Sequence, residues 1–336
     1  MAAAAALVAA PAARAASLRI VPERARPGDL VLLAVEGADP EAGLPPPAAV
    51  AGRPARFWGV PGGFRALAPL PVDLAPGPLE VEVRLAPDAP PLRARAEVAP
   101  ADFAEASLTV APRFVEPSPA QRRRMAEDQA AFDAVWATPF APPAFDAPFA
   151  PPREDEVTAP FGQRRVFNGR QQGQHHGVDL AGAPGDPVRA ANDGRVLLAR
   201  DCYASGKSVV VHHGAGVFSV YFHLSRMEVR PGDAVRRGQL VGRVGRTGRA
   251  TGPHLHFGVK VAGLYVDPDS VYRLDPAGPP LTAPAPPAGP RGGAAGSPGS
   301  PRRSSRRAAS PRRRRSPPPR PPPPGRAGSP APRPTA

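Results

Sequence analysis

Apolar and charged side chains alternate without a fault from Leu79 to Leu85, the pattern of a strand with one buried face. Other short apolar runs lie between residues 17 and 112, separated by Pro-Gly turns at 27–28, 61–62 and 76–77. These runs are 18–21, 30–35 and 55–58. Several short strands at this spacing predict an immunoglobulin-like β-sandwich. Residues 17–112 contain no His and no catalytic constellation, so we interpret them as an accessory spacer or targeting domain.

The spacing becomes helical between residues 118 and 137. Ser118 can cap the helix, Pro119 suits its first position, and Gln121 completes a capping box. One face is then expected to carry Met125, Phe132, Val135 and Trp136. A Pro-rich stretch at 139–152 ends the helix. Residues 113–152 are therefore predicted to form a helical and Pro-rich linker.

Residues 153–274 are rich in Val and Gly and contain all seven His of the chain. Helical periodicity is absent, and strands are predicted at 195–199, 208–213, 217–222, 239–244 and 255–261. Two similar segments, 184–189 and 231–236, each contain Pro-Gly-Asp and indicate two equivalent turns. The pattern predicts a small antiparallel β-domain, which makes the whole chain mainly β.

The last part of the chain differs in composition. Residues 276–336 carry 12 Arg and no other charged side chain, so they account for all but two units of the net charge of +14. With almost no large apolar side chain, residues 275–336 are predicted to be a disordered Pro/Arg-rich tail. The Arg run at 302–315 can attract an anionic envelope polymer. Without interleaved aromatic residues or a binding fold, specific nucleic-acid recognition is not expected.

The start of the chain is Ala-rich and weakly apolar. Residues 1–16 resemble a short secretory signal, with Ala13-Arg14-Ala15 as a small-x-small cleavage site; a disordered start is the alternative interpretation. No apolar run reaches the roughly 20 residues of a membrane span. The single Cys, Cys202, excludes an intrachain disulfide, so the domains depend on packing or on a metal.

Two pairs of residues indicate chemistry. His175 and Asp179 lie four apart in a Gly-flanked segment, and His254 and His256 lie two apart at the start of a predicted strand. Residues two or four apart on a strand point to one face. Two imidazoles and one carboxylate form a three-ligand zinc set with one open position, the arrangement of catalytic zinc. Water held at that position becomes a nucleophile near neutral pH.

The part of the chain that contains these pairs resembles peptidase family M23, the lysostaphin/LytM-type zinc endopeptidases. The resemblance extends from Ala159 to about Pro268. Its matching strings are His175-His176-Gly177-Val178-Asp179, Tyr221-Phe222-His223-Leu224, Gly238-Gln239-Leu240-Val241-Gly242, Thr247-Gly248-Arg249-Ala250-Thr251-Gly252-Pro253-His254-Leu255-His256-Phe257 and Val266-Asp267-Pro268.

The resemblance implies a role for each matching residue. It makes His175, Asp179 and His256 the ligands of one Zn²⁺ per chain, while His176 occupies a variable position. It makes His254 the catalytic imidazole that polarises water or the oxyanion, with His223 as its partner on the other wall of a groove. The implied activity is hydrolysis of peptide cross-links or stem peptides of peptidoglycan by an exported protein of the periplasm or cell envelope.

Two other functions compete with this one. A catalytically silent LytM-type domain would bind peptidoglycan or activate another wall hydrolase, but the complete ligand set argues against it. A lipoyl- or biotinyl-type carrier would need an exposed hairpin Lys, and neither Lys207 nor Lys260 lies in that place.

Five further residues have a structural interpretation beside a functional one. Asn168 either touches substrate or forms an Asn-Gly turn, and Tyr221 either lines the groove or packs in the core. Structural or inert roles are expected for His212, His213 and Cys202.

Overall fold

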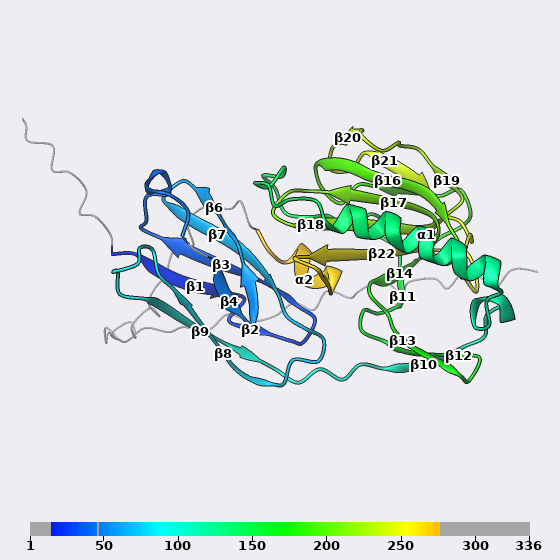
Figure 1. The fold of residues 1–336 in the computed structure, drawn as a ribbon, viewed down its shortest axis with the longest axis horizontal. Helices are drawn as coiled ribbons and strands as arrows, with labels where there is room; N and C mark the ends of the chain where they lie inside the picture. The colour runs from blue at the N-terminus through cyan, green and yellow to red at the C-terminus, as the bar shows by residue number, and fades with distance from the viewer. Residues whose placement is uncertain (1–14, 46, 276–336) are drawn as a thin grey trace, which may run out of the picture. The chain divides into compact units, whose positions relative to one another are not determined.

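The computed structural model describes residues 15–45 and 47–275. It is mainly β, with 42% of residues in strands and 11% in helices, as the sequence predicts (Figure 1). The interpretations of residues 1–14 and 276–336, including the signal and the Arg-rich tail, lie outside the described residues. Among the described residues, no helix combines the length and the apolar character needed to cross a bilayer.

The N-terminal region contains two sheets that share one core. The first has the order β1 (Ser17–Val21), β3 (Leu30–Glu36), β7 (Gly63–Pro69), β6 (Phe57–Val60), and the second β2 (Arg24–Ala25), β9 (Leu92–Val98), β8 (Gly77–Val83). A hairpin of β4 (Ala48–Val50) and β5 (Arg53–Ala55) and the short 3₁₀ helix η1 (Pro40–Ala42) complete it. Side chains from both sheets, such as Ile20 and Val81, belong to one buried cluster. The arrangement is a β-sandwich; its immunoglobulin-like topology stays a prediction.

Two local expectations in this region have different outcomes. Leu79, Val81 and Val83 are buried while the residues between them are exposed, as alternation predicts. The single strand expected at 55–58 is wrong, because the chain changes sheets at Arg56. Ala55 still pairs with Ala48 in the hairpin, whereas Phe57 pairs with Ala66 in the four-stranded sheet.

Helix α1 (Pro119–Trp136) begins with the predicted capping box between Ser118 and Gln121. Asp128, which is buried, accepts hydrogen bonds from Arg200 Nε at 2.8 Å and from Tyr203 N at 2.7 Å. These bonds fix the helix on strand β16 (Gly194–Cys202) and the loop that follows it.

The packed face of α1 differs in part from the expectation. Met125 was expected on this face but is 38% exposed, because the helix contacts the sheet mainly through Phe132, Val135 and Trp136.

The C-terminal region is organised around one long sheet. Its order is β11 (Val157–Ala159), β14 (Val178–Ala181), β22 (His254–Val261), β18 (Val217–Leu224), β17 (Gly206–His212), β16 (Gly194–Cys202), β20 (Ala234–Val235), with β23 (Leu264–Val266) paired to β22. A smaller sheet contains β15 (Pro187–Arg189), β21 (Leu240–Arg243) and β19 (Arg226–Met227). The predicted strands are thus present, within a few residues at their ends. The five-residue helix α2 (Pro268–Tyr272) was not predicted.

The two Pro-Gly-Asp segments form equivalent turns, as predicted. Gly185 and Gly232 have φ angles of 95° and 94°. In each turn the Asp side chain accepts from a backbone N–H three residues earlier, Asp186 from Ala183 and Asp233 from Arg230, both at 2.8 Å. The same local sequence thus produces the same turn before β15 and before β20.

A third sheet joins the segment just before the linker to the C-terminal region. Strand β10 (Glu105–Leu108) pairs in parallel with β12 (Arg164–Phe167), which pairs with β13 (Gln171–Gln174). Beyond β10, the 3₁₀ helix η2 (Pro112–Phe114) leads to α1. Residues that precede the linker helix are therefore part of the structure around the candidate site described next.

Candidate metal centre and groove

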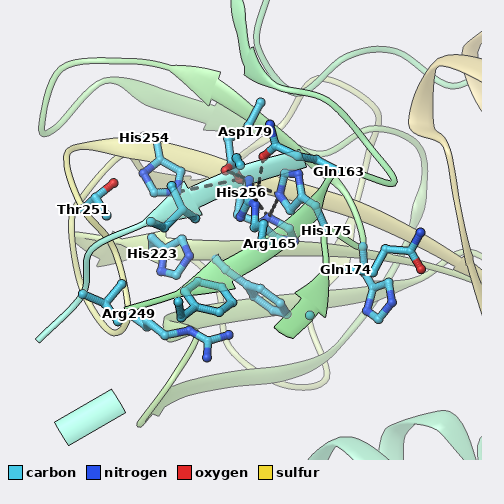
Figure 2. A pocket seen from close by; sticks show the side chains of 18 of the residues that line it. Gln163, Arg165, Gln174, His175, Asp179, His223, Arg249, Thr251, His254 and His256 are labelled. Atoms are coloured by element: carbon cyan, nitrogen blue, oxygen red, sulfur yellow. Dashed lines mark hydrogen bonds and ion pairs between the residues drawn. The ribbon is translucent and has the colours of Figure 1, made fainter. Parts of the chain in front are cut away.

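The register of two neighbouring strands brings together two of the four residues of the sequence pairs. β14 and β22 are antiparallel, with Asp179 opposite His256. His254 lies two residues before His256 on the same strand and hence on the same face. Figure 2 shows the three side chains close together in one cavity. The pair His254 and His256 therefore shares one face of the sheet, as expected from its spacing.

His175 reaches the same point from the short connection between two strands and not from a strand. It lies between β13 and β14, where its N–H donates to Gln163 O at 2.9 Å. The chain just after His175 passes so close to β22 that a Cβ on Gly177 would lie 2.3 Å from Phe257 O and 2.9 Å from the His256 ring. A glycine is therefore required here for His175 and His256 to approach each other.

Three donor atoms converge from these elements. His175 Nε2 and His256 Nδ1 each lie 2.9 Å from Asp179 Oδ1 and 2.9 Å from each other. Among the described residues, these three form the one group with donor atoms spaced to hold a metal ion. All three are buried or nearly so.

The protonation of His175 fits a cation at this point. Its Nδ1 lies 2.8 Å from Pro160 O, a carbonyl that can only accept, so Nδ1 carries the proton. Nε2 then directs a lone pair at the Asp179 carboxylate. The lone pair and the carboxylate repel each other as they stand. A cation placed between the imidazole nitrogens and the carboxylate oxygen would attract all of them, and this set of donors suits zinc.

Two further imidazoles lie beside this group. His223 Nδ1 lies 2.8 Å from Thr247 O and His254 Nδ1 lies 2.9 Å from Gly252 O, so in both rings Nδ1 donates and Nε2 is the basic atom. The ring centroids are 4.9 Å apart. His254 Nε2 lies 3.8 Å from Asp179 Oδ1, which places it at the edge of the candidate metal centre.

Burial and charge both act on the ionisable groups here. Burial, aided by the neighbouring imidazoles His254 and His256, lowers the pKa of His223 to about 3. Burial likewise lowers the pKa of His256 to about 4, despite its contact with Asp179. Burial alone would raise the pKa of Asp179, but the contacts of its carboxylate with the two neighbouring imidazoles, His175 and His256, hold it well below its usual range. His223 and His256 are thus neutral near pH 7 beside an ionised carboxylate, and a neutral imidazole and a carboxylate are the states that ligate metal.

The centre lies in a cavity of about 560 Å³. One part of the lining comes from the segment before the linker helix, through the alternate residues Ala106, Leu108 and Val110. Elsewhere His176 stacks on Tyr265, with ring centroids 5.1 Å apart and planes 2° apart. His176 therefore lines the cavity through its ring and is not one of the three converging donors, as expected for the variable position.

The other candidate residues have structural contacts. The Asn168 side chain donates to Val110 O and accepts from Val110 N, both at 2.9 Å, and its φ of 51° fits the predicted turn. Tyr221 is fully buried, where its hydroxyl accepts from Ala191 N at 2.8 Å. His213 is fully buried, while Phe218 stacks on His212. Burial raises the pKa of the Cys202 thiol, consistent with an inert role.

The sequence analysis did not identify Arg165 or Arg249 as site residues. Arg165 Nη2 donates to Asp179 Oδ2 at 2.7 Å, on the carboxylate oxygen that does not face the imidazoles. Arg249 stacks over Phe167, with Cζ 4.4 Å from the ring centroid. In the sequence, the Arg and Phe residues of the 162–169 segment show no spacing that would distinguish a functional site from an ordinary exposed hairpin.

The fold and the site define a β-sheet protein with a His-Asp-His group beside a second pair of imidazoles. Residues 173–268 match the family model described as peptidase family M23. The chain thus contains a domain of peptidase family M23, as the sequence indicated.

Curated relatives share this part of the chain. The DD-carboxypeptidase/endopeptidase Mpg of Neisseria meningitidis is 39% identical over 115 residues, 34% of this chain and 26% of Mpg. The peptidoglycan DD-endopeptidase ShyB of Vibrio cholerae is 41% identical over 126 residues, 37% of this chain and 29% of ShyB. The chain spans about a quarter of the length of such relatives.

A solved structure extends the likeness beyond the peptidase region. A protein of Pseudomonas aeruginosa named as an M23 peptidase aligns with 75% of this chain and 95% of its own length, at 29% identity and a TM-score of 0.56. An alignment of that length includes residues outside 173–268. The arrangement of further β-structure with an M23 region thus also occurs in another protein.

Proposed function

We propose that this protein is a zinc-dependent endopeptidase that hydrolyses peptide cross-links or stem peptides of peptidoglycan. One observation carries the proposal. The donor atoms of His175, Asp179 and His256 converge at 2.9 Å, and two imidazoles with basic Nε2 atoms lie beside them. An intact ligand set next to proton-transfer groups is the equipment of a hydrolase rather than of a silent binding domain.

In this proposal one Zn²⁺ is held by His175, Asp179 and His256. When bound there, zinc supplies Lewis acidity that polarises a carbonyl and acidifies water. His254, at the edge of the centre, takes the proton from the attacking water on Nε2, and the N–H formed there can then stabilise the developing oxyanion. His223, 4.9 Å away between ring centroids, shares this task from the other side.

Backbone contacts keep the two catalytic imidazoles ready. The carbonyls of Thr247 and Gly252 hold the Nδ1 protons of His223 and His254, so each ring keeps one tautomer and one orientation. His223 has a left-handed φ of 62°, unusual for a residue with a Cβ. Such a backbone conformation at a cavity is consistent with a residue placed for function.

The relatives support the class of substrate. Mpg, ShyA and ShyB are named for DD-endopeptidase activity, the latter two on peptidoglycan. By analogy we propose peptidoglycan as the substrate and the periplasm or cell envelope as the location. In the same scheme residues 17–112 form an accessory domain, 113–152 a linker and 153–274 the peptidase domain.

Digestion of purified peptidoglycan tests the proposal. The zinc-loaded protein should release cleaved cross-links that mass spectrometry identifies, whereas chelator-treated protein and zinc-treated His256→Ala should not. If the protein binds one equivalent of zinc and leaves all cross-links intact, the proposal is wrong. The alternative of a silent domain that regulates another wall hydrolase would then take its place.

A further inference from the structure

The cavity around the candidate metal centre has an excess of positive charge. Among the residues that line it, the carboxylates are represented by Asp179 alone, while two guanidinium groups, those of Arg165 and Arg249, contribute positive charge. Asp179 is already engaged by Arg165 and by two imidazoles. A zinc ion would add two further positive charges. The lining therefore suits an anionic ligand better than a neutral one.

Arg249 has no carboxylate partner in the described part of the chain. Its side chain lies over the Phe167 ring, and its backbone N–H donates to Ala204 O at 2.7 Å, which fixes the loop but leaves the guanidinium uncommitted. The group is half-buried. Burial and the charge of Arg165 both lower the pKa of Arg249. The positive charge of this guanidinium is therefore not balanced by a neighbouring negative charge.

Arg165 supplies a second, oriented donor close to the candidate metal centre. Its Nε donates to Gln163 Oε1 at 3.1 Å and its Nη2 donates to Asp179 Oδ2 at 2.7 Å. Its Nη1 has no acceptor among the described residues. Figure 2 shows Arg165 beside the metal-centre residues and Arg249 in the part of the cavity near His223. An anion in this cavity would therefore meet cationic donors on more than one side.

We propose that Arg249, assisted by Arg165, binds a carboxylate on the residue that supplies the nitrogen of the scissile amide. The inference rests on the proposed peptidase function and narrows its substrate. A diamino acid whose acylated amino group and free carboxylate share one carbon places an anion next to the scissile nitrogen. An interior glycine of a bridge offers no carboxylate. A planar guanidinium matches a carboxylate through two parallel hydrogen bonds.

Two sources offer this chemistry. One is a cross-link between stem peptides through such a diamino acid, and the other is an uncross-linked stem that ends in D-Ala-D-Ala, whose terminal carboxylate lies at the same position. Both carry the carboxylate on the leaving-group side of the amide. Glycine bridges, in contrast, should be poor substrates.

The test uses the zinc-loaded full chain and matched synthetic peptides. The first pair is a cross-linked dimer with the adjacent carboxylate free or converted to a carboxamide. A stem ending in D-Ala-D-Ala, with its own amidated version, and a pentaglycine peptide complete the set. The variants are Arg249→Gln, Arg249→Lys and, as a control, Arg246→Gln, an exposed Arg of the same loop that does not line the cavity.

We expect the wild type to cleave the free acid with a kcat/KM roughly 10- to 100-fold above that of the carboxamide. Arg249→Gln should remove this preference mainly through KM, Arg249→Lys should restore part of it, and Arg246→Gln should preserve it. Comparison of the cross-linked and D-Ala-D-Ala pairs identifies the source. The proposal is overturned if Arg249→Gln slows acid and carboxamide equally, or if the wild type cleaves pentaglycine as fast as the acid.

A separate measurement keeps the two proposals distinguishable. If the zinc-loaded protein cleaves no peptide, the proposed function fails, and calorimetric binding of the same matched peptides then tests the carboxylate site alone. The free acid should bind at least about tenfold more tightly than its carboxamide, and Arg249→Gln should abolish the difference. Equal binding of acid and carboxamide by the wild type would refute the site.

Discussion

Asp179 and His256 face each other across the β14–β22 ladder, with Oδ1 of one 2.9 Å from Nδ1 of the other. The next strand continues the row, because Phe222 of β18 pairs with His256 and stacks on its ring at 5.4 Å between centroids. The sheet itself thus holds the imidazole from both sides. Of the three converging residues, His175 alone lies outside this ladder, in the connection between β13 and β14.

The neighbouring residues His175 and His176 give a direct test of the ligand assignment. His175→Ala removes one of three converging donors and should weaken zinc binding by a factor on the order of 100 or more. His176→Ala is the matched control and should retain one equivalent, because its ring stacks on Tyr265 and is not one of the three donors. Metal content after dialysis against a zinc buffer measures both. Loss of zinc in His176→Ala alone would contradict the assignment.

The imidazoles of His223 and His254 should separate catalysis from metal binding. His254→Asn keeps a donor near Gly252 O but removes the basic Nε2, so we expect kcat to fall by roughly 10²- to 10⁴-fold while zinc content stays at one equivalent. His223→Asn should behave in the same way, with a carbonyl of Thr247 in place of that of Gly252. A variant that loses zinc together with activity would instead make that residue a ligand.

Residues in and just after β10 alternate between lining the cavity and facing solvent, which gives a test of the cavity wall. Ala106, Leu108 and Val110 line the cavity, whereas Ser107 and Thr109 are exposed. Leu108→Trp should therefore obstruct the cavity and lower kcat/KM on cross-linked peptides by roughly 10- to 100-fold, with zinc content unchanged. Thr109→Trp places the same ring on the exposed side of this alternating segment, just after β10, and should have little effect.

Sequence patterns predicted the parts of this structure that depend on local rules. The capping box of α1, the alternation of β8 and the Pro-Gly-Asp turns all follow from neighbours in the chain. The His and Asp candidates converge as the motifs suggested, although His175 lies in the short connection between β13 and β14 and not on a strand.

Features made by distant segments were not predicted. The pairing of β10 with β12, which brings Leu108 to the cavity, joins residues about 60 apart, and no local pattern encodes it. Arg165 and Arg249 likewise can be identified as site residues only from the structure, where strand β12 and the loop before β22 line the same cavity. The change of sheets at Arg56 was missed because its flanking residues, Ala55 and Phe57, are apolar and buried, which reads as one strand.

The last prediction concerns stability and a buried imidazole away from the candidate metal centre. His213 is fully buried against Phe149, with Nδ1 2.6 Å from Asp193 O and Nε2 2.8 Å from Ser219 Oγ. Burial lowers its pKa to about 4 in the folded protein, from about 6.5 in an unfolded chain. Between these values the unfolded state binds more protons, so acidification favours unfolding.

The contribution of His213 to the free energy of unfolding should thus be complete above about pH 6.5 and decline as the pH falls toward 4. Chemical denaturation of the metal-free wild type and of His213→Asn, at pH 7 and pH 4.5, isolates this contribution. The stability advantage of the wild type should shrink by about 2 kcal/mol between the two pH values. Because other buried imidazoles titrate equally in both proteins, an advantage that does not change with pH would mean that His213 keeps an ordinary pKa in the folded state.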